Sequence, residues 1–254
     1  MAFTSMIMRR VASLLTLALL ASTPAGAGTS DCPAGTIYLS FDTGSMHSAE
    51  LIAQTLRDEN VKATFFLANE PTFRGDHSLD AAWAPYWKRL ADEGHVFGNH
   101  TWSHYIARRD DGSHIQLASM GGRPVVLDEH QYCEELRKVE QAFARHTGRK
   151  LSGLWRAPGG RTTQNSVRYA AACGYPLHVH WDNAGFIGDE LPSDKYPNSL
   201  LLERALNNLK GGDVAMMHLG IWSRKDPAAP ILKSLIQGLK QRGFCFGTLG
   251  EVQR

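Results

Sequence analysis

Short apolar segments alternate with longer amphipathic segments along most of this chain. The short segments are rich in β-branched and aromatic residues, which is typical of buried strands. They predict strands at residues 36–41, 63–67, 95–99, 151–155, 176–181, 213–217 and 244–249. The longer segments place apolar residues three or four positions apart, which is typical of helices packed against a sheet. They predict helices at residues 49–59, 79–93, 129–147, 163–173, 199–210 and 230–242.

The alternation of strands and helices predicts a parallel sheet joined by right-handed crossover helices. The chain has 254 residues, which is enough for one α/β domain of barrel size. We find no internal repeat or low-complexity segment, so we expect an α/β barrel with a single domain. Residues 105–127 carry few helix or strand signals and several glycines. We therefore expect a long surface loop there.

Polar residues follow five of the predicted strands. They are Asp42, His100, Arg156, Asp182 and His218. An α/β barrel brings the C-terminal ends of its strands to one face, where its catalytic groups lie. We therefore expect these five side chains to contribute to one site.

His100 and His104 are the candidate metal ligands. Two histidines four residues apart can direct both imidazoles at one ion, and neutral imidazole is a good ligand for Zn²⁺ and similar metals. The alternative is that they are ordinary histidines, since the chain contains 11 of them. Their place among the other strand-end residues favours the metal site.

Composition and charge narrow the class of protein. Hydrophobic residues make up 43% of the chain and charged residues 20%, which indicates a globular fold. The formal net charge is +2, so we expect no nucleic acid among the partners. We find no phosphate-cradling glycine loop, which argues against a kinase or a nuclease.

The first 27 residues have the layout of a signal peptide. Arg9 and Arg10 form a positive region, residues 11–21 form an apolar region too short to span a bilayer, and residues 25–27 form an A-x-A cleavage site. The alternative is a buried core helix. We expect a signal peptide at 1–27, a catalytic domain at 28–254, and export to a bacterial periplasm or beyond. No membrane span is expected to remain after cleavage.

Export changes the interpretation of the four cysteines. An even number of cysteines in an oxidising compartment permits two disulfides. Cys32 precedes the first predicted strand and Cys245 lies in the last, and these strands are neighbours in a closed barrel. We therefore favour Cys32–Cys245, which leaves Cys133–Cys173. Free buried thiols are the alternative.

Four short motifs resemble those of the NodB-like polysaccharide deacetylases, carbohydrate esterase family four. The likeness runs from Thr36 to Leu249. The F-D-D-G element of the family corresponds to residues 41–44, and its H-[ST]-x-x-H element is complete at 100–104. Its R-x-P element is met at 156–158, and its L-x-H element appears as residues 216–218. The resemblance implies a distorted barrel of about seven β/α units.

The resemblance also implies metal-dependent removal of acetyl groups from N-acetylated sugar polymers, with zinc as the expected metal. His100 and His104 would hold the ion. Asp42 would be the catalytic base, oriented by Arg156, and His218 the general acid. The backbone N–H of Gly159 would stabilise the oxyanion of the substrate, and Met216 would line the pocket for the acetyl methyl group. The family has a further motif, D-x-x-D-W, whose expected position in this chain falls on Asp182. The full pattern is absent here, and Asp182 would support the site.

The chain departs from the family at Thr43, where the resemblance implies a carboxylate metal ligand. Threonine is neutral and a poor ligand, so the metal should bind more weakly, or a water or another oxygen must fill the gap. His47 follows in the same loop and is a candidate to approach the ion. The chain is therefore either a hydrolase with a weakened site or a glycan-binding relative without activity.

The expected partner is a carbohydrate polymer or oligomer, and we expect a monomer. A close variant of the activity is O-deacetylation of a polysaccharide such as xylan. Three tryptophans near the motifs are candidates for stacking on sugar rings: Trp102, Trp181 and Trp222.

Overall fold

A computed structural model describes residue 1 and residues 32–250. The predicted signal peptide at 1–27, and its boundary with the domain at residue 28, lie outside the described residues apart from Met1. Within residues 32–250 no helix is both long and apolar enough to cross a membrane.

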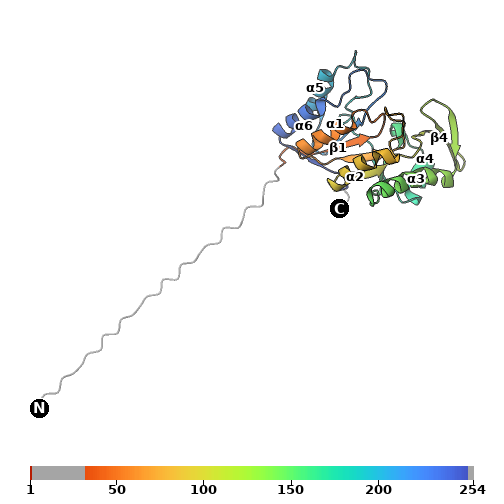
Figure 1. Cartoon of the computed structure of the whole chain (residues 1–254), viewed down its shortest axis with the longest axis horizontal. Coiled ribbons are helices and arrows are strands. Elements are labelled where there is room, and N and C mark those ends of the chain that lie inside the picture. The colour runs from red at the N-terminus through yellow and green to blue at the C-terminus, as the bar shows by residue number, and fades with distance from the viewer. Residues whose placement is uncertain (2–31, 251–254) are drawn as a thin grey trace. The chain divides into compact units, whose positions relative to one another are not determined.

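The centre of the fold is a parallel sheet of seven strands (Figure 1). The strands are β1 (Gly35–Asp42), β2 (Thr64–Leu67), β3 (Val96–Asn99), β7 (Leu154–Trp155), β8 (Leu177–His178), β9 (Val214–His218) and β10 (Phe244–Gly247). Their order is β10-β1-β2-β3-β7-β8, and β9 also pairs with β1. Within residues 32–250, an isolated parallel bridge between Phe186 and Met216 extends the sheet beside β9. The predicted class, a distorted α/β barrel, is confirmed.

Six α-helices lie against this sheet in the described part of the chain. They are α1 (Ala49–Asp58), α2 (Ala84–Asp92), α3 (Glu129–Thr147), α4 (Gln164–Ala172), α5 (Asn198–Asn208) and α6 (Ile231–Gln241). The 3-10 turn η1 (Ala81–Trp83) precedes α2, where one longer helix was predicted. Helix α3 agrees with its predicted bounds, because a capping box begins it at Asp128 and Gly148, at φ 71°, ends it.

Residues 105–127 are not the surface loop that the sequence suggested. They form a separate antiparallel sheet of β4 (Ile106–Asp111), β5 (His114–Ala118) and β6 (Pro124–Leu127). Gly112 and Ser113 form the two-residue turn between β4 and β5, because Asp111 and His114 are already paired, and Gly112 has a positive φ of 58°. Ile115 and Leu117 are buried under the sheet, which explains why it is ordered. In Figure 1 this sheet lies at the end of the fold that carries α3 and α4.

Both predicted disulfides are present. Cys32–Cys245 joins the segment before β1 to β10, and Cys133–Cys173 joins α3 to the end of α4. The first bond follows from the pairing of β1 with β10, which brings Thr36 opposite Cys245. The first and last strands of the fold are therefore neighbours, as a barrel requires.

Candidate active site

The C-terminal ends of the sheet strands surround a cavity of about 380 Å³. Six residues predicted for the site line it: Asp42, His100, His104, Gly159, Met216 and His218. Strand β1 delivers Asp42, β3 leads into His100, and β9 ends at His218. Side chains separated by more than 170 residues in sequence thus meet at one face, as expected for an α/β barrel.

Arg156 is fully buried beneath the cavity and holds Asp42. Its Nη1 donates to Asp42 Oδ1 at 2.7 Å, and its Nη2 donates to Ser40 Oγ at 2.9 Å. Its Nε donates to the carbonyl of Val179 at 3.1 Å, and the guanidinium lies 4.1 Å from the centre of the Phe66 ring. Because every edge of the guanidinium is engaged, it presents a fixed charge to Asp42.

The groups around Asp42 decide its protonation. Burial alone raises the pKa of this carboxyl, but the Arg156 guanidinium, together with the neighbouring His100 and His218, lowers the pKa overall. Asp42 is 3% exposed, so its pairing with Arg156 takes place away from bulk water. It is therefore ionised at neutral pH and able to accept a proton.

His100 is held with one ring nitrogen facing the cavity. Its Nδ1 lies 2.7 Å from the carbonyl oxygen of Arg156, and since a carbonyl only accepts, Nδ1 carries the proton. Burial lowers the pKa of His100 to about 4, so the ring is neutral at pH 7. Its Nε2 therefore carries no proton and presents a lone pair, at 3.5 Å from Asp42 Oδ2. Two electron-rich atoms face each other, which is an arrangement suited to a cation.

His104 lies on a tightly constrained loop after β3. Thr101 and His104 both have positive φ angles, 61° and 52°, which are uncommon for residues other than glycine. Two contacts hold the loop: Thr101 N donates to Asn99 Oδ1, and Ser103 N donates to Glu135 Oε2 on α3. The ring centres of His100 and His104 are 4.8 Å apart. Strained backbone of this kind is typical of functional loops.

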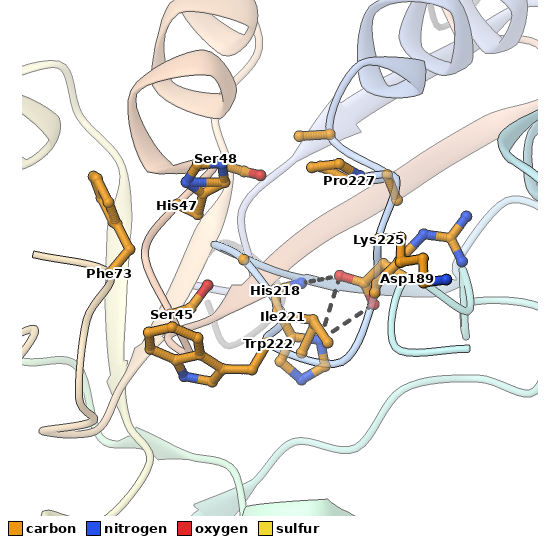
Figure 2. A pocket seen from close by; sticks show the side chains of 14 residues that line it. Ser45, His47, Ser48, Phe73, Asp189, His218, Ile221, Trp222, Lys225 and Pro227 are labelled. Atoms are coloured by element: carbon orange, nitrogen blue, oxygen red, sulfur yellow. Dashed lines mark hydrogen bonds and ion pairs between the residues drawn. The ribbon is translucent and has the colours of Figure 1, made fainter. Parts of the chain in front are cut away.

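His218 is paired with Asp189, a residue that the sequence analysis did not identify (Figure 2). His218 Nδ1 lies 3.2 Å from Asp189 Oδ1, and the backbone N–H of His218 donates to Asp189 Oδ2 at 2.6 Å. Burial lowers the pKa of His218, but the surrounding carboxylates, Asp189 foremost among them, more than compensate and raise it to about 9. The imidazole is therefore protonated at neutral pH, and its Nε2 is available as a proton donor.

Asp182 lies elsewhere than the sequence suggested. It is exposed, and its Oδ2 accepts a hydrogen bond from the N–H of Val214 at the first residue of β9. His218 lies at the opposite end of the same strand. The carboxylate beside His218 is Asp189. It comes from the loop after β8 and does not directly follow any strand predicted from the sequence.

Glu70 is a second residue that the sequence analysis missed. It lines the same cavity, three residues beyond the end of β2. Thr43 is fully buried, and its hydroxyl donates to Glu70 Oε2 at 2.5 Å. The strand-end rule that identified Asp42 also points to Glu70, because β2 lies between β1 and β3. The neutral residue at position 43 is thus in contact with a carboxylate from the neighbouring strand.

The donor set at this end of the cavity is chemically suited to a divalent metal. Two imidazoles and a carboxylate, from His100, His104 and Glu70, are ligands that zinc accepts. Among the described residues no three His, Cys, Asp or Glu side chains are grouped to hold an ion. His104 Nδ1 contacts the sulfur of Met120 at 3.1 Å.

A second pocket of about 260 Å³ adjoins the first at His218 (Figure 2). His47 lines this neighbouring pocket, where its ring contacts Phe73, and it does not line the cavity of the histidine pair. Trp222 is exposed and lines both spaces, so it is available to a sugar ring. Trp181 lines the main cavity, whereas Trp102 packs against the core.

Comparison with known proteins identifies the family of this chain. The model of the family described as polysaccharide deacetylase matches residues 29–178. The chain belongs to this family. A relative, the peptidoglycan-N-acetylglucosamine deacetylase of Bacillus cereus, is 27% identical over 217 residues, which cover 85% of this chain and 67% of the relative. The predicted family and enzyme class, a polysaccharide deacetylase, are confirmed.

Solved structures share the fold. A family 4 acetyl xylan esterase from Clostridium thermocellum, solved with a cobalt ion, has a TM-score of 0.66 and 21% identity, covering 85% of this chain and 89% of that one. A CE4 family pseudoenzyme from Bacillus anthracis has a TM-score of 0.62 and 18% identity, covering 87% of this chain and 66% of that one. At these identities the likeness describes the fold alone.

Proposed function

We propose that this protein is an exported, metal-dependent deacetylase that removes acetyl groups from N-acetylated amino-sugar polymers, such as peptidoglycan or chitin-like glycans. One observation supports it above the others: an ionised carboxylate held by Arg156 and a protonated imidazole held by Asp189 face one cavity. A protein that only binds glycans needs neither of these opposed pKa shifts.

The chain's own residues supply the proton transfers of hydrolysis. Asp42 takes a proton from the attacking water while the water oxygen forms a bond to the acetyl carbon. His218 then gives its proton to the sugar nitrogen as the carbon–nitrogen bond breaks, which releases acetate and a free amine. The Gly159 N–H stabilises the oxyanion, and Met216 lines the space for the acetyl methyl group. A divalent metal, for which we propose zinc, would polarise the carbonyl and acidify the water when bound by His100 and His104.

Export is part of the proposal. The signal-peptide pattern at 1–27 precedes a domain at 28–254, and two disulfides link the described part of the chain. Disulfides persist in oxidising compartments such as the periplasm or the cell exterior. Export supports the proposed substrate class, because envelope and environmental glycans are found outside the cytoplasm. The related Bacillus cereus enzyme is also named for peptidoglycan.

Two alternatives keep specific support. Thr43 in place of a carboxylate favours a glycan-binding protein without activity. The same machinery also cleaves O-acetyl esters, and one protein of the same fold is named as an acetyl xylan esterase.

Acetate release by the purified protein tests the proposal. Substrates are N-acetylglucosamine oligomers and acetylated xylan, assayed after metal removal and again with added Zn²⁺ or Co²⁺. We expect metal-dependent release from the amino-sugar oligomers, and loss of release in Asp42→Asn and His100→Ala. Release from xylan alone would favour the esterase, and no release from either glycan would leave a binding protein.

A further inference from the structure

Glu70 is an acidic residue of the cavity that the proposed roles do not use. It follows β2, the strand between the one that delivers Asp42 and the one that leads into His100. Its backbone is fixed on both sides by Ser78: Glu70 N–H donates to Ser78 Oγ at 3.1 Å, and Ser78 N–H donates to the Glu70 carbonyl at 2.9 Å. The side chain therefore leaves a rigid turn and enters the space beside the histidine pair.

One of its carboxylate oxygens is anchored and the other is available. The hydroxyl of Thr43 accepts a hydrogen bond from Ala68 N–H at 3.1 Å, so its own proton is directed to Glu70 Oε2. Glu70 Oε1 accepts no hydrogen bond from the described residues. Metal-binding carboxylates are typically hydrogen-bonded by a neighbouring residue through one oxygen, which leaves the other oxygen for the ion. Half-buried Glu70 has this arrangement.

We propose that Glu70 is the carboxylate ligand of the metal that His100 and His104 bind, with Thr43 as its positioning residue. The inference rests on the proposed function and deepens it. Two imidazoles and a glutamate form a ligand set that catalytic zinc sites use. The negative charge that position 43 does not provide is supplied from the neighbouring strand, and the threonine hydroxyl keeps that carboxylate in place.

Assembly of this centre would involve the side chain of His104, which is held only weakly. His104 is partly exposed, and the contact of its Nδ1 is with the thioether of Met120, a weak acceptor. Met120 is itself 67% exposed, on the turn between β5 and β6. His100 already presents Nε2 to the cavity, fixed by the carbonyl of Arg156. The second imidazole, whose ring centre lies 4.8 Å from that of His100, is therefore held by a weak contact that a metal ion would replace.

The affinity of the full protein for Zn²⁺ tests the proposal, measured by competition with a chromophoric chelator. Glu70→Gln keeps the shape of the side chain and removes its charge, and we expect affinity to fall at least about 10-fold. The matched control is Glu190→Gln, which removes the same charge from the lining of the same cavity but on the side of His218. We expect the affinity of this control to stay within about 3-fold of the original protein.

A rescue experiment separates a ligand from a merely structural residue. Thr43→Asp in the Glu70→Gln background places a carboxylate on the neighbouring strand and should restore Zn²⁺ affinity. Visible absorption of the Co²⁺-loaded protein should change in Glu70→Gln and not in Glu190→Gln, since only a ligand alters the metal's coordination.

Three results would overturn the assignment. Equal losses in Glu70→Gln and Glu190→Gln would indicate general electrostatics. An unchanged affinity in Glu70→Gln with a large loss in Asp42→Asn would make Asp42 the ligand. If the original protein binds neither Zn²⁺ nor Co²⁺, Glu70 has no metal to hold, and the acetate-release assay decides separately whether the proposed activity fails too.

Discussion

Asp42 and His218 lie opposite each other on paired strands, and their surroundings shift their pKa values in opposite directions. Burial opposes both shifts, but Arg156 and its neighbours lower the pKa of Asp42, whereas Asp189 and the other nearby carboxylates raise the pKa of His218 to about 9. Two groups with separated pKa values can act as base and acid at the same pH. Between these values Asp42 is ionised and His218 is protonated, which is the state that the proposed mechanism requires.

Asp189→Asn tests this division of labour. The group with the raised pKa, His218, keeps its proton below about pH 9 and loses it above, so activity should fall as pH rises through that value. Without the Asp189 charge, burial lowers the His218 pKa, and the alkaline limb of the kcat/KM profile should move to lower pH. At pH 8 we expect kcat/KM to fall at least about 10-fold.

Asp182→Asn is the control for that profile. Asp182 accepts a hydrogen bond from Val214 at the far end of β9, and asparagine can accept the same bond. We expect its alkaline limb to coincide with that of the original protein. An alkaline limb in Asp189→Asn that stays near pH 9 would show that Asp189 does not control the proton on His218.

The residues of the site differ in how far the sequence reveals them. Asp42, Arg156 and His218 stand at strand ends, and strand ends converge in this class of fold. Asp189 does not, because it lies in an irregular segment after β8, and only the path of that loop brings it to His218. Glu70 obeys the strand-end rule, yet its contact with Thr43 depends on side-chain positions that no local pattern encodes.

The loops after β1 and β9 approach each other closely at Gly44. Its φ is 114°, and a Cβ atom there would lie 2.4 Å from the carbonyl oxygen of Gly220. These loops follow the strands that carry Asp42 and His218, and Ser45 N–H donates to the same Gly220 oxygen at 2.9 Å. The glycine in the motif at 41–44 therefore permits contact between two elements of the site.

Gly44→Ala should separate these two loops. Gly174→Ala is the matched comparison, because Gly174 has a similar φ of 95° but no heavy atom within 4 Å of the added Cβ. Both changes strain the backbone, and only the first also causes an overlap. We expect Gly44→Ala to lower the free energy of unfolding by about 1–3 kcal/mol more than Gly174→Ala, measured by urea denaturation. Equal losses would mean that backbone strain alone explains the glycine.

The sheet of β4, β5 and β6 shows what the pattern left out at the level of elements. Its strands are short and carry charged residues on the open face, so the alternation is weak. The Gly112–Ser113 pair is a hairpin signal that the glycine content of the segment obscured. The long helices were predictable because their apolar faces repeat over several turns, as in α3.

At the scale of the whole molecule, the fold depends on the meeting of its first and last strands. Cys32–Cys245 ties them across a sequence separation of 213 residues, whereas Cys133–Cys173 spans 40 residues. The neighbourhood of β1 and β10 was predictable from the barrel class alone, and with it the first disulfide. The second followed because two cysteines remained.

Removal of each disulfide should destabilise the protein to a different extent. Paired Cys→Ala changes delete either bond, and each should lower the free energy of unfolding by about 2–5 kcal/mol. A cross-link restricts the unfolded chain more when it closes a longer loop. With separations of 213 and 40 residues, the chain-entropy model gives Cys32–Cys245 an advantage of about 1.5 kcal/mol. Urea denaturation of the two double variants measures the difference directly. A larger loss of unfolding free energy on removing Cys133–Cys173 would contradict the chain-entropy model. It would indicate that the disulfide stabilises mainly through the contact between α3 and α4.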